Sequence, residues 1–298
     1  MKWAQMIWVY MLTKSNKLQA RDVHSLSEVQ RLDKKANWFW IDCMEPDDKE
    51  LEVIAGMLKE PEILSAIKKR QIFSRYRKTN DYVLISIPLV IFKDKLETYP
   101  VYVFAKEKTV ITVRSKHSSK SIDNTLKTFQ DCILKVCERD VASSFIVNRL
   151  FHEVSDENLE VVMVLRAHTD EIEEKAFANP GDKQINKMIF ALKREVFTLE
   201  RILWTQRELM LSIEEGVVPV VQPSELDEQT LSHAVSNISR ELSLISSNED
   251  ALDSILRLQD LGMIHRVERI LIYLTLVTLI VNVIMILIEV DIIRIISS

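Results

Sequence analysis

The chain has 298 residues, with 44 Asp and Glu against 39 Lys and Arg side chains, and a formal net charge of −5 at pH 7. This balance argues against a general nucleic-acid binder, and no basic stripe interleaved with aromatic residues is found. The four glycines form neither a GxGxxG motif nor a phosphate-binding loop, which excludes the common nucleotide-binding motifs. Three cysteines without a CxxC spacing favour free thiols in a reducing compartment.

The sequence also lacks the motifs of common hydrolases, because it has no GxSxG, no HExxH and no convincing Ser/His/Asp set. His117, His152, His168 and His233 have no metal-ligand spacing with one another. We therefore expect a protein that is not an enzyme, with no catalytic residue and no resident cofactor.

Strand and helix patterns alternate in the first part of the chain, which predicts an N-terminal α/β domain over residues 1–118. Five apolar runs are typical of strands: Ile7–Leu12, Trp38–Asp42, Tyr82–Phe92, Val101–Phe104 and Val110–Val113. Three helices are predicted: Ser25–Asp33, one from Pro46 through Lys59, and Pro61–Lys69.

Long helical patterns replace the strands from about Ser121, which predicts stalk helices over residues 119–223. Two long helices are expected at Val141–Phe177 and Lys183–Glu214. The segment Asn179-Pro180-Gly181 separates them, since Pro and Gly break helices.

A third long helix is predicted to begin after Ser224, with Asp227 three residues later as the partner in a capping box. It runs from about Leu226 to Ile288, which is roughly 95 Å at about 1.5 Å per residue. Residues 224–269 are therefore expected to form a long stalk helix that enters the membrane.

A membrane span is predicted at Ile270–Ile288, where 19 residues carry no charge and about 20 are needed to cross a bilayer. The basic flank holds His265, Arg266 and Arg269, and the acidic flank holds Glu289 and Asp291. The positive-inside tendency places the large domain in the cytoplasm and the short tail, residues 289–298, outside. Ten residues follow the span, so no second crossing is expected in this chain.

Thr275, Thr278 and Asn282 of the span, together with Glu289 at its end, share one helical face, because they are separated by 3, 4 and 7 positions. One interpretation is that the threonines bond back to their own helix and Asn282 joins two helices in a dimer. The other is a ring of helices around a polar path, with Asn282 inside and carboxylates at the outer mouth, where they favour cations.

Acidic residues also cluster on the first long helix. The first group is Glu153, Asp156, Glu157 and Glu160, and the second is Asp170, Glu171, Glu173 and Glu174. They form either a solvated helix face or a collar that concentrates cations near the pore. Likewise, His265 and Arg266 either line the cytoplasmic mouth or extend to lipid headgroups.

Several motifs, taken in order, resemble those of one known protein family. Trp40-Ile41-Asp42 followed by Pro46 is similar to the family's W-I-D-x-x-x-P segment. Four groups of this chain resemble the family's stalk pattern at matching spacing: Leu192-Lys193-Arg194, Leu199-Glu200-Arg201, Ile202-Leu203-Trp204 and Arg207-Glu208. Further similar stretches are Arg75-Tyr76, Asn80-Asp81-Tyr82-Val83-Leu84-Ile85 and Arg266–Leu271. In this ordered set of motifs the chain resembles the CorA family of divalent-cation channels.

The chain departs from the family at the end of the predicted span. On an ungapped alignment from Arg269, Glu289-Val290-Asp291 replaces the Gly-Met-Asn signature, and Ile280 replaces the usual pore-helix proline. No counterpart of the family's second membrane helix is expected. Two acidic positions that sense Mg²⁺ between subunits in some members fall on Ala66 and Thr230.

The resemblance implies a homo-oligomer, specifically a homopentamer, in the cell membrane, with the N-terminal domain cytoplasmic and the C-terminus outside. It would move or bind Mg²⁺ or Co²⁺ by electrodiffusion through a central pore, with membrane lipid as a further partner and no nucleic acid. The expected pore-lining residues are Leu271, a hydrophobic constriction, and Thr275, Thr278 and Asn282. Glu289, Val290 and Asp291 would form the outer mouth, with Glu289 and Asp291 as metal ligands. The alternative is a CorA-like scaffold or regulatory protein that is anchored in the membrane but does not transport.

Overall fold

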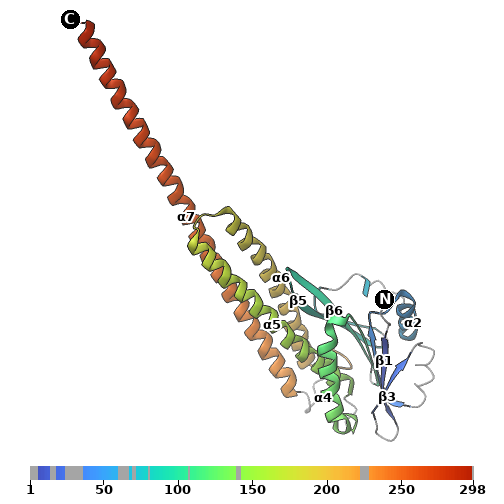
Figure 1. Cartoon of the computed structure of the whole chain (residues 1–298). Helices are drawn as coiled ribbons and strands as arrows, with labels where there is room; N and C mark the ends of the chain where they lie inside the picture. Colours follow the sequence, from blue (N-terminus) through green and yellow to red (C-terminus); the bar gives the residue numbers. More distant parts are fainter. Residues whose placement is uncertain are drawn as a thin grey trace. The chain divides into compact units, whose positions relative to one another are not determined.

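The structure is a computed structural model (Figure 1) and describes residues 6–13, 18–23, 36–59, 67–68, 72–79, 81–106, 108–138, 142–221 and 228–296. The predicted helix Ser25–Asp33, most of Pro61–Lys69 and the capping pair of Ser224 and Asp227 lie outside the described residues. The chain divides into two compact units. The sheet unit comprises Met1–Leu165 and Glu195–Ser246, and the hairpin unit comprises Arg166–Arg194 and Ser247–Ser298.

A seven-stranded sheet in the order β2-β1-β3-β7-β6-β5-β4 forms the centre of the sheet unit. Its strands are β1 Met6–Thr13, β2 Leu18–Val23, β3 Ala36–Met44, β4 Arg75–Lys78, β5 Val83–Phe92, β6 Leu96–Lys106 and β7 Thr109–Arg114. Neighbouring strands are antiparallel except for β3 and β7, which pair in parallel. The five predicted strands are confirmed. The other two, β2 and β4, were not predicted, because LQARDV and RYRK show little apolar alternation.

Helix α2 (Asp48–Leu58) packs on one face of this sheet through Leu51 and Ile54, which join a core with residues of β1, β3, β6 and β7. The helix begins at Asp48 rather than at Pro46, because Asp47 is its N-cap. The side chain of Asp47 accepts a hydrogen bond from the backbone N–H of Glu50 at 2.8 Å, and the side chain of Glu50 accepts one from the backbone N–H of Asp47 at 2.9 Å. This capping box fixes the turn that follows β3.

A buried polar network joins β3 to β7 and to the helix that follows. Trp40 Nε1 donates to Thr112 Oγ1 at 3.1 Å, and that hydroxyl donates to Asp42 Oδ1 at 2.6 Å. Arg114 binds the same carboxylate through Nε at 3.0 Å and Nη2 at 2.7 Å. Its Nη1 donates to Ser119 Oγ at 3.0 Å. The Trp-Ile-Asp segment therefore ties the parallel strand pair together from inside.

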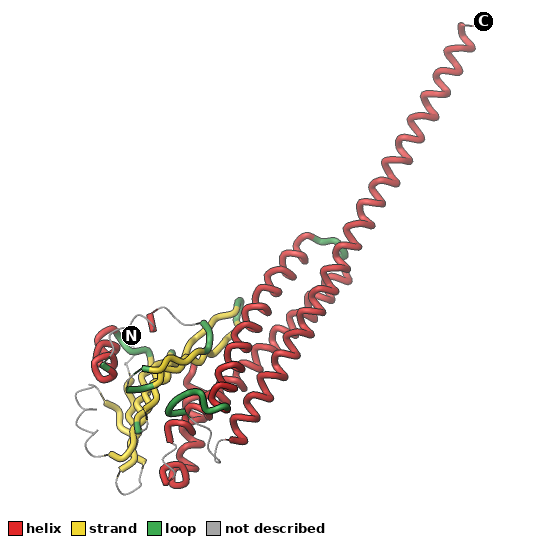
Figure 2. Tube along the Cα trace, turned by 180° about the vertical axis from the view of Figure 1, so that it is seen from behind, coloured by secondary structure: helices red, strands yellow, loops and turns green. Residues whose placement is uncertain are grey.

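Four long helices follow the sheet, drawn red in Figure 2: α4 Ser119–Glu138, α5 Ala142–Ala178, α6 Lys183–Glu214 and α7 Glu228–Ile296. Helix α6 has the predicted bounds, and α5 differs from its predicted bounds by one residue at each end. Helix α7 continues past the predicted end at Ile288 to Ile296. Its buried residues recur every three or four positions, as in a coiled-coil seam.

Candidate functional site

The C-terminal part of α7 is the feature that points to a membrane. Among the described residues, one helix is long and apolar enough to cross a bilayer, within Gln229–Ile286, and none of its most apolar window is buried. Every side chain from Met263 to Ile286 is exposed in the single chain. An apolar helix surface of this length needs lipid or other helices around it.

We call the face formed by the predicted pore-lining residues Leu271, Thr275, Thr278 and Asn282 the stripe. The two threonine hydroxyls of the stripe are satisfied by their own helix. Thr275 Oγ1 donates to the carbonyl oxygen of Leu271 at 2.8 Å, and Thr278 Oγ1 donates to that of Leu274 at 2.9 Å. These hydroxyls need no partner from another chain, although their oxygens can still accept a hydrogen bond.

Asn282 differs from the two threonines, because its side-chain amide makes no hydrogen bond to any described residue of the chain. An amide left unpaired in hydrocarbon costs roughly 2–7 kcal/mol. Asn282 therefore needs water or a neighbouring helix beside it once the span lies in a bilayer.

A close contact in the hairpin unit anchors α7 before the span begins. The turn between α5 and α6 lies against Gly262, where a Cβ would meet the Cβ of Pro180 at 2.5 Å and the backbone nitrogen of Gly181 at 2.8 Å. Gly181 itself has φ +79°, a conformation that favours glycine. Gln259, fully buried, accepts from the N–H of Gly181 at 2.6 Å and donates to the carbonyl of Ala176 at 3.2 Å. We call this contact the clasp.

The clasp and the stripe lie on different faces of the same helix. At about 100° per residue, the buried face of Leu252, Ile255, Gln259 and Gly262 is about 150° from the stripe of Leu271, Thr275, Thr278 and Asn282. The α5–α6 hairpin therefore covers one side of α7, and the stripe lies on nearly the opposite side.

The predicted outer mouth lies at the end of α7. The backbone of Glu289, Val290 and Asp291 is helical, and the helix continues to Ile296. The side chains of these three residues lie outside the described ones, so their role as metal ligands stays a prediction. Among the described residues, no group of three His, Cys, Asp or Glu side chains could hold a metal ion.

The basic flank of the span is partly paired within the chain. His265 Nδ1 lies 3.1 Å from Glu268 Oε2, and Arg266 Nη2 donates to the carbonyl of Pro180 at 3.3 Å. Arg266 thus adds a polar contact to the clasp.

Most acids of the first cluster on α5 are bound to other side chains. Glu153 pairs with Arg149 at 2.5 Å, Glu160 pairs with Lys120 of α4 at 2.9 Å, and Glu157 accepts from Ser121 of α4. Burial raises the pKa of Glu157 above its usual value. The contacts of Glu157 and Glu160 join α4 to α5, and Glu153 pairs within α5, which favours a structural role over a cation-collecting collar.

Sequence reasoning missed Glu241, a fully buried carboxyl group on α7. Its Oε1 accepts from Ser155 Oγ of α5 at 3.2 Å, and its Oε2 has no hydrogen-bond partner among the residues that the structure describes. Burial, with a smaller contribution from Asp156, raises the pKa of Glu241 to about 8. The heptad pattern of the sequence could have identified it, because Ile238 and Ile245 are seven residues apart and place Glu241 between them in the buried seam.

Comparison with known proteins agrees with this architecture. The family described as CorA-like Mg2+ transporter protein matches residues 35–283. The cobalt/magnesium transport protein CorA of Methanocaldococcus jannaschii is 20% identical over 184 residues, which cover 61% of this chain and 56% of that protein. The match therefore spans little more than half the length of this relative.

Solved structures show the same fold. The complete CorA magnesium transporter of M. jannaschii has a TM-score of 0.70 at 15% identity, covering 93% of this chain and 83% of that one. The full-length CmaX protein has a TM-score of 0.69 at 16% identity, and the match covers 92% of this chain and 82% of that one. The ZntB cytoplasmic domain of Vibrio parahaemolyticus has a TM-score of 0.59 at 12% identity, and the match covers 89% of this chain and 100% of that one.

These findings confirm the predicted fold class, an α/β domain followed by long helices and one apolar C-terminal helix. They confirm the resemblance on which the functional prediction rests, and a transporter family agrees with a chain that is not an enzyme. The match over residues 35–283 covers well over half of the chain, which therefore belongs to the CorA-like Mg2+ transporter family.

Proposed function

We propose that this chain assembles as a homopentamer in the cell membrane and conducts divalent cations of the Mg²⁺ or Co²⁺ type along a path lined by the stripe of α7. The N-terminal domain would face the cytoplasm and the C-terminus the outside. Family membership supports divalent-cation transport, and the pentamer rests on the family resemblance.

The position of the stripe relative to the clasp is the observation that carries the proposal. Each chain covers one face of α7 with its own α5–α6 hairpin, about 150° from Asn282. When several copies surround an axis with their hairpins outward, the stripes face that axis. The unpaired amide of Asn282 then meets water or a hydrated ion instead of hydrocarbon.

The chemistry of the path follows from its side chains. Asn282 offers a neutral carbonyl oxygen, and Thr275 and Thr278 offer hydroxyl oxygens while donating to their own backbone. Glu289 and Asp291 contribute two carboxylates from every chain at the outer mouth, which attract cations and partly replace their water. Leu271 narrows the path with an apolar side chain. No covalent step is involved, and the ion moves down its electrochemical gradient.

The second candidate is a membrane-anchored scaffold or regulatory protein that has lost transport. The observation that favours it is Glu289-Val290-Asp291 in place of the Gly-Met-Asn signature. Charged carboxylates hold Mg²⁺ more strongly than neutral carbonyls do, and conduction needs sites that the ion can leave.

Flux measurements separate the two candidates. The full chain is reconstituted in liposomes, and uptake of Mg²⁺, Co²⁺ and Zn²⁺ is followed with an indicator trapped inside. Flux from a pentameric preparation supports the channel. A well-folded pentamer without flux of any of the three ions supports the scaffold and rejects the channel.

Substitution in the stripe then tests the path itself. Asn282→Leu is compared with Ile284→Leu, which changes a residue on the opposite face of the same helix. We expect Asn282→Leu to alter flux while the oligomer mass in detergent is unchanged, and Ile284→Leu to change neither. If Asn282→Leu dissociates the oligomer and Ile284→Leu does not, Asn282 joins helices rather than lining a path.

A further inference from the structure

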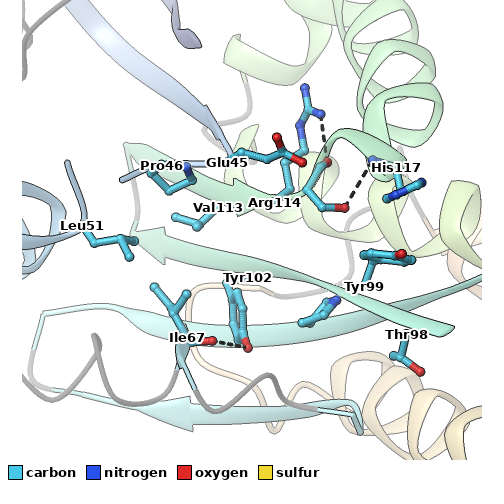
Figure 3. A pocket seen from close by; sticks show the side chains of 12 residues that line it. Glu45, Pro46, Leu51, Ile67, Thr98, Tyr99, Tyr102, Val113, Arg114 and His117 are labelled. Atoms are coloured by element: carbon cyan, nitrogen blue, oxygen red, sulfur yellow. Dashed lines mark hydrogen bonds between the residues drawn. The ribbon is translucent and has the colours of Figure 1, made fainter. Parts of the chain in front are cut away.

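A cavity of about 340 Å³ lies in the sheet unit at the carboxyl ends of the parallel strands β3 and β7 (Figure 3). Chain segments after parallel strands diverge at this edge of a sheet, which is where ligands bind in many α/β proteins. The volume falls within the range of small-molecule pockets, about 300–1,000 Å³. The residues that line it belong to the sheet unit, whereas the stripe of α7 belongs to the hairpin unit.

Glu45, the first residue after β3, lines this cavity in a strained conformation. Its φ is +50°, which lies in the left-handed region. A non-glycine residue adopts this conformation at an energy cost of roughly 1–2 kcal/mol. Its backbone N–H donates to the carbonyl of Arg114 at 2.8 Å and so extends the pairing of β3 with β7. Strained backbone conformations of this kind are often found at functional sites.

The carboxylate of Glu45 is exposed to solvent, and no described side-chain cation pairs with it. It accepts one long hydrogen bond, from the backbone N–H of Lys116 at 3.5 Å, and forms no ion pair with a described residue. It therefore places a negative charge at the wall of the cavity that no side-chain cation of the described residues balances.

Arg114, the guanidinium in the same wall, is already occupied. It binds both oxygens of Asp42, and its Nη1 donates to the carbonyl of Ser115 and to Ser119 Oγ. The Arg114 and Asp42 side chains are 6% and 1% exposed, so this pair contributes little net charge to the cavity. The cavity therefore favours a cation over an anion.

The remaining walls are aromatic and apolar. The Tyr99 ring packs against the His117 ring with centroids 4.1 Å apart and planes tilted by 33°, and Tyr102 lies between Tyr99 and Ile67 in the view of Figure 3. Leu51, Ile67 and Val113 line the apolar end. Tyrosine faces attract organic cations, whereas a bare metal ion would find one free carboxylate here and few other ligands.

We propose that this cavity binds a small organic cation, an amine or a guanidinium carried on an apolar body. Glu45 is the counter-ion of its head group, Tyr99 and Tyr102 form its aromatic wall, and Leu51 and Ile67 receive its apolar end. The site belongs to the sheet unit, and none of its residues is among those proposed to line the conduction path.

The test uses three probes that share one apolar body and differ in charge: phenethylamine, 2-phenylethanol and 3-phenylpropionate. Binding to the full chain in nanodiscs is measured by calorimetry at pH 7, with identical nanodiscs for every variant. We expect the amine to bind at least about tenfold more tightly than the alcohol, and the acid to bind most weakly.

Glu45→Gln should remove most of this preference for the amine. We expect the affinity for phenethylamine to fall about tenfold and the affinity for 2-phenylethanol to stay nearly unchanged. Glu45→Gly removes the carboxylate and suits the positive φ, so it keeps the test valid if the glutamine variant folds poorly. Glu52→Gln, an exposed substitution on α2 outside the cavity lining, is the matched control. Equal binding of amine and alcohol, no amine binding up to about 10 mM, or an unchanged preference in both Glu45 variants overturns the proposal.

Discussion

Glu241→Gln should stabilise the protein at neutral pH and remove much of its pH dependence. Burial raises the pKa of Glu241 to about 8 from an ordinary value of 4.5, so the folded chain holds a proton that the unfolded chain releases. Asp156 on α5 adds to this rise, while Ser155 and Arg240 oppose it. Stability from this group is thus fully present below pH 4.5 and is lost as the pH rises towards 8.

The size of this stability effect follows from the difference between pH 7 and the ordinary pKa of a glutamate side chain. At 1.36 kcal/mol per pH unit, keeping Glu241 protonated at pH 7 costs about 3 kcal/mol of folding free energy. Glutamine has nearly the same shape and no charge, and its Oε1 can still accept from Ser155. The gain corresponds to a rise in Tm of roughly 6–12 °C for a unit of this size.

Thermal unfolding of the full chain in detergent, followed by tryptophan fluorescence between pH 5 and pH 9, measures the effect. The Tm of Glu241→Gln should match that of the natural chain near pH 5 and exceed it increasingly up to about pH 8. Glu174→Gln, on the exposed face of α5, serves as the control and should leave the curve unchanged. Parallel Tm curves for Glu241→Gln and the natural chain would refute a buried, protonated Glu241.

Two further substitutions test contacts described above. Asp42→Asn leaves the buried guanidinium of Arg114 without its counter-charge, and we expect a loss of about 3–5 kcal/mol in unfolding experiments. A loss below about 1 kcal/mol would contradict the buried pair. Gly262→Ala places a Cβ 2.5 Å from Pro180 and should cost about 1–3 kcal/mol. Gly56→Ala, in a helix with open space around it, should instead gain about 0.5–1 kcal/mol, and equal effects would contradict the clasp.

The sequence predicts elements with strong local signals and misses those that depend on distant neighbours. Helix α6 has the predicted bounds because Pro180-Gly181 and Gly216 break the helical pattern on either side. Strand β4 was missed because RYRK is polar, and its pairing with Val83–Ser86 becomes visible only in the folded sheet.

The candidate site was predicted to a similar degree. The spacing of Thr275, Thr278 and Asn282 places them on one face from sequence alone, since the helical period is local. The clasp was not foreseen, because Gly181 and Gly262 are far apart in the sequence and a close approach leaves no local pattern. Glu45 was missed because its strain and its cavity arise where β3 ends beside β7.

The short stretch of α7 between Gly262 and Leu271 acts as a spacer whose length matters more than its composition. Inserting one residue there would turn the stripe by about 100° relative to the clasp and expose Asn282 to lipid. Inserting seven would turn it by only about 20°, although it would lift the span by roughly 10 Å. Substitutions at exposed positions such as Val267 and Glu268 leave this angle unchanged. Deletions and insertions in this spacer are therefore far more disruptive than point changes.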